Sequence, residues 1–399
     1  MHDILPALRV DIQLSVHTED GEQFLVLSDP FSIADGPIMV NVDMLDLLQA
    51  CDGETTYHAL AQASSVDPDG AEIMRVRAFI QELSSLGYLE GDGFLARQTA
   101  IEAEWDSRAE RPTVCAGTTY PADPTEAAEF FSTVLGLPSG SSHNVGGDTH
   151  DYPRAVLVPH IDYRVAPHVY APGFLPLANH PAELVIAIGT SHYWSDDAFI
   201  LTTKHYQTPF GTVQTDTNLV DMLRQTLPGV APTDVAHRPE HSLELHLTAL
   251  KHLWGNKPFR VVPILVTMAV CETPETLQRA VDALRAAVAS SGASTVWCIS
   301  GDLAHVGRKF GDAEPADVLI DSVRVADAAV LRHLEQADVR GYDAEISATD
   351  HQFRICGYAP TVVALQALTP ARGTVAAYDV WHETETASAV SFASVVFHD

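Results

Sequence analysis

The order of hydrophobic and polar positions divides the chain into two parts, one ending near residue 97 and one beginning near residue 113. In the second part, near-continuous apolar runs alternate with segments whose apolar residues recur at helical spacing. Continuous apolar runs are typical of strands in a sheet that is covered on both faces. The pattern therefore predicts an α/β domain with a central sheet flanked by helices on both faces. Strands are expected at 154–160, 183–192, 260–266, 294–302 and 389–397, and two of the helices at 273–290 and 360–368.

The first part, residues 1–97, has shorter apolar runs separated by turn residues. Strand-like runs at 24–30 and 38–43 precede helical spacing at 44–53, 56–64 and 71–87, and a further strand-like pattern follows at 87–98. This order predicts a small α+β domain of the winged-helix type, with 87–98 entering the wing. Residues 98–112 are polar and lack a strand pattern, which indicates a linker or a helix that crosses between the domains.

Composition narrows the classes of function. The 399 residues include 53 acidic and 23 basic ones, and the formal charge of −30 opposes binding to nucleic acid or to anionic membrane surfaces. No stretch reaches the roughly 18 apolar residues of a membrane-spanning helix, and the start lacks the basic and apolar regions of a signal peptide. We therefore expect a cytoplasmic protein without nucleic-acid or membrane partners. The five cysteines never have a CxxC spacing, which indicates neither a disulfide framework nor a zinc cluster.

Three of the expected strands are followed by side chains that can bind a metal or move a proton. The first strand delivers His160, the second delivers His192, and the fourth delivers Asp302 and His305. Functional sites of such sheets lie beyond the carboxyl ends of the strands. The helical segment RPEHSLELHL adds four candidates: Glu240, His241, Glu244 and His246. A single histidine is more often a core or surface residue than a ligand, but the repetition at three strand ends favours a shared site.

The residue types indicate a metal centre. Imidazole suits iron, copper and zinc, and two histidines with an oxygen ligand leave positions open for substrate and dioxygen. We predict that His160, His192 and Asp302 bind the metal. A further histidine, with an ordinary pKa of about 6.5, can move protons at neutral pH, so the predicted catalytic residues are His241, His305 and Glu244. Cys356 is interpreted as a core residue rather than a ligand. A serine hydrolase is disfavoured because the sequence contains no GxSxG motif.

Residues 113–399 resemble the Memo family, in the group called AmmeMemoRadiSam system protein B. The resemblance rests on eight motifs in the expected order: AGTTYPADPTEAAEFF, VPHIDYRVAP, IGTSH, TPFGTVQTD, EHSLELHL, SGDLAHVGRKFGD, ICGYAPTVVALQAL and VSFASVVF. It implies a mixed-sheet α/β fold akin to the class III extradiol ring-cleaving dioxygenases, which hold non-haem iron. It also implies that His160, His192 and His241 line the site. Together with the imidazole ligands, it makes Fe(II) or copper the expected cofactor, with a metal-free protein as the alternative.

The first part of the chain resembles PqqD-like peptide-recognition modules, through the stretch LLQACDGETTYHALAQA and the later FIQELSSLGYLEGD. The resemblance implies docking of a peptide or partner protein. Its third helix has only Arg75 and Arg77 against Glu72 and Glu82, which argues against DNA as the partner. A domain that only packs against its neighbour is the alternative.

One position departs from the Memo pattern. Memo proteins of animals have a metal-binding cysteine where SGDLAHVG has Ala304. Side chains of neighbouring residues on a strand point to opposite faces, so His305 does not simply replace it. The sequence therefore leaves two alternative functions. The first is a metal-dependent redox enzyme that uses iron or copper on a small-molecule or peptide ligand. The second is a non-catalytic protein that binds a peptide or phosphorylated ligand in the same cleft and needs no metal.

Overall fold

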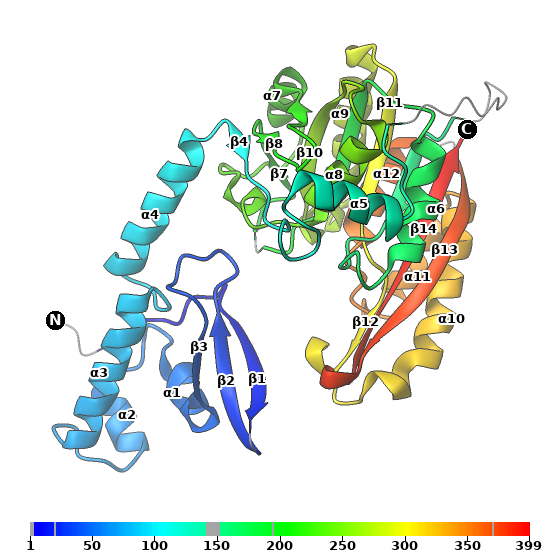
Figure 1. Cartoon of the computed structure of the whole chain (residues 1–399). Helices are drawn as coiled ribbons and strands as arrows, with labels where there is room; N and C mark the ends of the chain where they lie inside the picture. The colour runs from blue at the N-terminus through cyan, green and yellow to red at the C-terminus, as the bar shows by residue number, and fades with distance from the viewer. Residues whose placement is uncertain (1–3, 20, 141–151, 194, 369–370) are drawn as a thin grey trace. The chain divides into compact units, whose positions relative to one another are not determined.

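The chain folds as two units, Met1–Arg108 and Ala109–Asp399 (Figure 1). The computed structural model describes residues 4–19, 21–140, 152–193, 195–368 and 371–399. None of the helices in these ranges is long and apolar enough to cross a membrane.

The first unit combines a small antiparallel sheet with helices. Its three strands pair in the order β1 (Gln13–Glu19), β2 (Glu22–Ser28) and β3 (Ile38–Asn41). Three helices follow: α1 (Leu45–Ala50), α2 (Tyr57–Ala63) and α3 (Ala71–Leu86). Leu25 and Leu27 of β2 are buried with Ile73, Ile80 and Leu83 of α3. The core of this unit therefore lies between the sheet and the longest of these helices.

The predicted wing is wrong, because residues Asp92–Ser107 form a helix, α4. Gly91 and Gly93 suggest a turn between two strands, but only Gly91, at φ 142°, has a conformation that favours glycine, and the helix begins directly after it. Phe94 and Trp105 anchor α4 through their buried rings. The helix takes in most of the segment expected to be a linker or a crossing helix.

The second unit has a mixed nine-stranded sheet among the residues that the structure describes. The strands run β12-β14-β5-β11-β6-β10-β7, with β13 added beside β14 and β9 beside β10. Strands β5, β11, β6 and β10 are parallel, whereas β14 is antiparallel to β5 and β7 to β10. Their bounds are β5 Ala155–Val158, β6 Leu184–Thr190, β7 Phe199–Leu201, β9 Gln214–Thr215, β10 Arg260–Val266, β11 Thr295–Ser300, β12 His305–Gly307, β13 Arg372–Glu383 and β14 Ser388–His398. A separate pair joins β4 (Glu110–Arg111) to β8 (His205–Tyr206).

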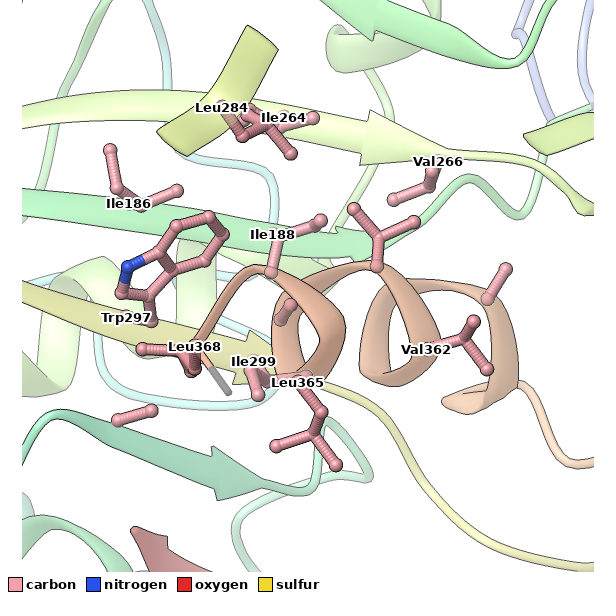
Figure 2. Packing of buried hydrophobic residues seen from close by; sticks show 14 of the residues in the cluster. Ile186, Ile188, Ile264, Val266, Leu284, Trp297, Ile299, Val362, Leu365 and Leu368 are labelled. Atoms are coloured by element: carbon pink, nitrogen blue, oxygen red, sulfur yellow. The ribbon is translucent and has the colours of Figure 1, made fainter. Parts of the chain in front are cut away.

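Helices cover both faces of this sheet, as the apolar runs predict. On one face, Ile186 and Ile188 of β6 pack with Trp297 of β11 and with Val362 and Leu365 of α12 (Figure 2). On the other face, the alternate residues of the same strands are buried in a second cluster. The first face is covered by α7 (Thr217–Thr226), α9 (Pro274–Ser291), α10 (Ala316–Glu335), α11 (Val339–Ser347) and α12 (Tyr358–Leu368). The second is covered by α5 (Pro124–Thr133), α6 (Pro167–Phe174) and α8 (Ser242–Trp254).

Candidate metal centre

Three adjacent parallel strands end at one level and deliver polar side chains to one place. Ser300, the last residue of β11, is in register with Val158 of β5 and Gly189 of β6. The residues just beyond these ends are His160, His192 and Asp302. The structure therefore brings together the three residues predicted as metal ligands, because parallel neighbours share a carboxyl edge.

The start of α8 adds His241 to the same group. Gly189 makes this approach possible, because a Cβ there would lie 2.9 Å from Leu243 Cδ2 and 3.0 Å from Ser242 Oγ. Ser242 Oγ also donates a hydrogen bond to the Thr190 carbonyl at 3.1 Å. His241 is the residue that precedes α8, and its side chain is 36% exposed.

The three histidine rings face one another. Ring centroids are 4.9 Å apart for His160 and His192, 5.2 Å for His160 and His241, and 4.7 Å for His192 and His241. One ligand atom from each ring lies within 4.8 Å of the other two. His160 is buried, whereas the His192 and His241 rings are partly exposed. The group thus forms the floor of a site that solvent reaches from one side.

Hydrogen bonds fix which nitrogen of His160 is free to bind a metal. Ser300 Oγ donates its one proton to the Ser242 carbonyl at 2.7 Å. The hydroxyl must then accept from His160 Nδ1, which lies 3.0 Å away. The lone pair of His160 is therefore on Nε2. Burial, followed by the neighbouring His192 and His241 rings, lowers the pKa of His160 well below its ordinary value, which keeps the ring neutral.

Glu240 orients the other two histidines. Its carboxylate lies 3.0 Å from His192 Nδ1 and 3.3 Å from His241 Nδ1, and it accepts main-chain N–H groups of His192 and Ser242. Burial would raise the pKa of Glu240, but His192 and His241 hold it well below the ordinary range. Burial would lower the pKa of His192, but Glu240 and Cys356 raise it well above normal. A carboxylate that accepts from Nδ1 of His192 leaves Nε2 of that ring for a metal, as in many known metal sites.

The Asp302 carboxyl is held beside His160. Its Oδ1 accepts the main-chain N–H groups of His160 at 2.9 Å and Ile161 at 3.3 Å, and its Oδ2 lies 3.8 Å from His160 Nε2. Burial raises the pKa of Asp302 to about 6, although the two N–H groups oppose the shift. One oxygen thus positions the loop that carries His160, and the other faces the proposed ligand nitrogen.

His305 lies at the start of β12, with Nδ1 3.1 Å from the Leu303 carbonyl and 3.0 Å from the Arg354 carbonyl. Its ring meets Phe310 edge-on, with centroids 5.1 Å apart. Burial lowers the pKa of His305 to about 4, so the ring is neutral at neutral pH. The predicted catalytic role of His305 stays a prediction.

Glu244 lies in a network of buried hydrogen bonds, and its predicted catalytic role stays a prediction. Its side chain is fully buried and accepts hydrogen bonds from the Arg111 guanidinium, the Tyr120 hydroxyl and the main-chain N–H groups of Val114 and Cys115. Arg111 also donates to the Glu240 carbonyl and to the His237 carbonyl at 2.7 Å. With its oxygens occupied by these donors, Glu244 ties the start of the second unit to α8.

Cys356, interpreted from the sequence as a core residue, is partly buried and lies beside His160 and Asp302. Its Sγ lies 3.3 Å from His160 Nε2 and accepts the Asp302 main-chain N–H at 3.3 Å. Ligand atoms of His160, Asp302 and Cys356 all lie within 4.8 Å of one another. Ala304, where a cysteine was expected from the Memo pattern, is instead buried in an apolar cluster with Val323 of α10.

A cleft of about 580 Å³ opens beside these residues. It is lined by His192 and Cys356 together with apolar and basic side chains, among them Tyr193, Met268, His351 and Arg354. His351 and Arg354 both have positive φ, 54° and 49°, which is uncommon for residues other than glycine. The volume falls within the range of small-molecule sites.

The family model and the sequence relatives point to one family. The family model described as Memo-like protein matches residues 111–396. A MEMO1 family protein of Aquifex aeolicus is 27% identical over 382 residues, covering 95% of this chain and 96% of that protein. One of Thermus thermophilus is 29% identical over 298 residues, covering 74% and 85%. A solved structure of an uncharacterized protein from Escherichia coli K12 covers 61% of this chain and 98% of that chain, with a TM-score of 0.38 and 14% identity.

Proposed function

This chain belongs to the family of Memo-like proteins, and within that family we propose that it is a metal-dependent redox enzyme with non-haem iron or copper at His160 and His192. The observation that carries the proposal is the orientation of the rings. His160 donates through Nδ1 to Ser300, and His192 does so to Glu240, so both Nε2 atoms are left for one shared ion. Imidazoles whose other nitrogen is held by a hydrogen bond are common ligands of both metals, and the His192 ring, whose pKa is raised, would release its Nε2 proton when a metal binds.

The ion would supply one-electron chemistry and an open coordination position for substrate and dioxygen. The protein residues have separate roles around it. Asp302 positions His160 through two main-chain hydrogen bonds, and its Oδ2 is a candidate oxygen ligand. His241 lies against His192, and burial, partly opposed by Glu240, lowers its pKa. It is therefore neutral at pH 7 and suited to accept a proton from a bound substrate.

The cleft beside His192 is the proposed substrate site. Its volume of about 580 Å³ suits a small molecule or the side chain of a peptide. Met268 and Tyr193 offer apolar contact, while His351 and Arg354 offer polar contact. A substrate bound there reaches the histidines from their exposed side.

Metal loading without oxygen tests this function. The purified chain is stripped with a chelator, reconstituted with Fe(II) or Cu(I), desalted and analysed for bound metal and for oxygen consumption. We expect close to one ion per chain in the wild type and a large loss in His160→Ala with His192→Ala. The control is His168→Ala with His382→Ala, which removes two partly exposed histidines that pair with Asp379 and Asp317. Equal loading of the site variant and the control would overturn the proposal.

A second candidate is favoured by Ala304, because a residue buried among apolar side chains supplies no ligand there. In this candidate the same cleft binds a peptide or phosphorylated ligand without chemistry. Removal of metal with a chelator distinguishes these two candidate functions. A redox enzyme loses its activity on chelation, whereas a metal-free binding protein keeps its affinity for a fluorescent peptide probe.

We propose that the N-terminal unit recruits a peptide or partner protein through its early hairpin, since the expected wing is a helix. Strand β1 is at the edge of its sheet and exposes Leu14 and Val16, which are 44% and 60% exposed. An edge strand offers unpaired main-chain groups to an added strand, and apolar side chains beside it give selectivity.

A further inference from the structure

We infer that residues 350–355 form a gate segment that changes the size of the cleft, and that an ion pair between Arg354 and Asp312 holds this segment closed. The segment lies between α11 and α12. The inference goes beyond the proposed function, because it concerns access to the cleft and needs no metal. It rests on the backbone conformation of the segment, on the spaces that it separates and on the contacts that hold it.

The gate segment has strained backbone at half of its positions. Asp350, His351 and Arg354 have φ values of 50°, 54° and 49°, in the left-handed region that residues with a Cβ rarely adopt. The structure describes seven non-glycine residues with positive φ, and three of them lie in this segment. Such conformations raise the energy of the backbone and persist only where surrounding contacts hold them. The closed segment therefore stores strain that a different conformation would release.

The gate segment also separates two spaces. His351, Arg354 and Ile355 line the cleft, and the same three residues line a second, smaller hollow. Val330 of α10 and Ile346 of α11 form part of the other walls of this hollow. Its volume is about 10 Å³, which is enough for about one water molecule. Because the same side chains form both linings, a movement of the segment changes the size of the cleft directly.

Arg354 fastens the gate segment to the turn that follows β12. Its guanidinium donates to the two carboxylate oxygens of Asp312, at 2.8 and 3.2 Å. Asp312 Oδ2 also accepts the main-chain N–H of Gly307 at 2.8 Å, which ties the carboxylate to β12. The Arg354 and Asp312 side chains are 40% and 20% exposed, so water and salt reach the pair. An ion pair in such a setting is weak, and it can break while the core stays folded.

Phe353 is the expected pivot of the movement. Its carbonyl accepts the main-chain N–H of His305 at 2.7 Å, and its side chain packs against two apolar clusters. Asp350 and Gln352, on either side of His351, are exposed. We therefore expect residues 350–352 to change conformation and the Arg354 side chain to leave Asp312, while Phe353 and the two flanking helices stay in place.

Hydrogen–deuterium exchange of the full-length protein, read by mass spectrometry in peptides that cover 349–356, tests the inference. Asp350→Gly removes the Cβ that strains the closed backbone, so exchange should slow by about fivefold. Asp350→Ala is the matched control, because it also removes the carboxylate but keeps the Cβ, and exchange should not slow. Asp312→Asn weakens the ion pair with Arg354, so exchange should become about two- to fivefold faster. Peptides from α12 should be unchanged in all three variants.

Salt gives a second measurement on the same peptides. Raising sodium chloride from about 0.05 M to about 0.5 M should speed exchange in the wild type and have no effect in Asp312→Asn, because salt screens the ion pair. Asp317→Asn is a further control, since it removes an exposed carboxylate that pairs with His382. It should exchange like the wild type.

Three results would overturn the inference. The first is equal exchange of 349–356 in Asp350→Gly and Asp350→Ala, which would show that no strain is released on opening. The second is exchange that rises neither in Asp312→Asn nor with salt, which would show that the ion pair does not hold the segment. The third is an equal change in the α12 peptides, which would mean that the whole domain unfolds. Each result leaves the proposed metal site untouched, because exchange is measured without metal.

Discussion

Glu240 accepts a hydrogen bond from the main-chain N–H of His192 at 2.8 Å and lies 3.0 Å from Nδ1 of the same residue. One buried carboxylate thus fixes both the backbone and the ring of a proposed ligand. The contact also raises the pKa of His192 against the effect of burial. Glu240 therefore governs how His192 presents Nε2, although it does not bind the metal itself.

Replacing Glu240 by glutamine should weaken metal binding about 10- to 100-fold, because a neutral amide no longer stabilises Nδ1–H of His192 and can donate as well as accept. Titration with copper(I) against a competing chelator measures the effect. Glu183→Gln is the control, since Glu183 is an exposed carboxylate that binds Ser294 outside the site. Unchanged affinity in Glu240→Gln would show that the carboxylate has no part in orienting the ligand.

Glu244→Gln should lower the free energy of unfolding by about 3–5 kcal/mol, because it leaves the buried Arg111 guanidinium without a counter-charge. Denaturant unfolding gives the value. Asp221→Asn, which removes an exposed partner of Arg224, should change it by less than about 1 kcal/mol. A Glu244→Gln variant that is as stable as the wild type but no longer consumes oxygen when loaded with metal would contradict this expectation and support the catalytic role predicted for Glu244.

Asp327 should make the protein less stable as the pH rises. Burial on α10 raises its pKa from 3.8 to about 6, although hydrogen bonds from Ser391 and Tyr378 oppose the shift. A carboxyl whose pKa is higher in the folded state favours folding below about pH 4, and this contribution is lost as the pH passes through 6. Relative to Asp327→Asn, the wild type should lose up to about 3 kcal/mol between pH 4 and pH 7.

The measurement for Asp327 is the difference in unfolding free energy between the two proteins at several pH values. Asp321→Asn is the matched control, because Asp321 is exposed on the same helix. A difference that does not change between pH 4 and pH 7 would contradict the expected linkage.

Residues 109–399 expressed alone should fold and bind the same amount of metal as the full chain. All proposed ligands and the sheet that positions them belong to this unit. Circular dichroism and metal analysis of the shortened chain check this. If the proposed recruitment is correct, partner binding should be lost at the same time. A truncated chain that unfolds, or that keeps the partner, would contradict the division of roles.

The sheet is the part of the fold that the sequence predicts best. All five expected buried strands are present, because strands covered on both faces need continuous apolar runs. Strand β13 escaped prediction because it pairs only with β14 and alternates between exposed and partly buried residues, which weakens the apolar signal. The wing failed for a different reason, since two glycines near Asp92 resemble a turn while the helix depends on the burial of Phe94 and Trp105.

The candidate site was predictable where it follows directly from strand ends. His160, His192 and Asp302 come straight after buried strands, so their convergence needs only a parallel sheet. Cys356 lies in a loop rather than at the end of a strand, and a single cysteine has no spacing motif that places it near the histidines. Its position depends on the contact of Gly301 with Gly357, which only the folded chain reveals.

Anomalous diffraction from crystals of the copper-loaded protein is the most direct measurement of whether His160 and His192 share one ion. The proposed centre predicts a single strong anomalous peak about 2.1 Å from Nε2 of both histidines. A fully loaded protein whose anomalous peak lies away from these histidines, or that shows no peak beside them, would contradict it.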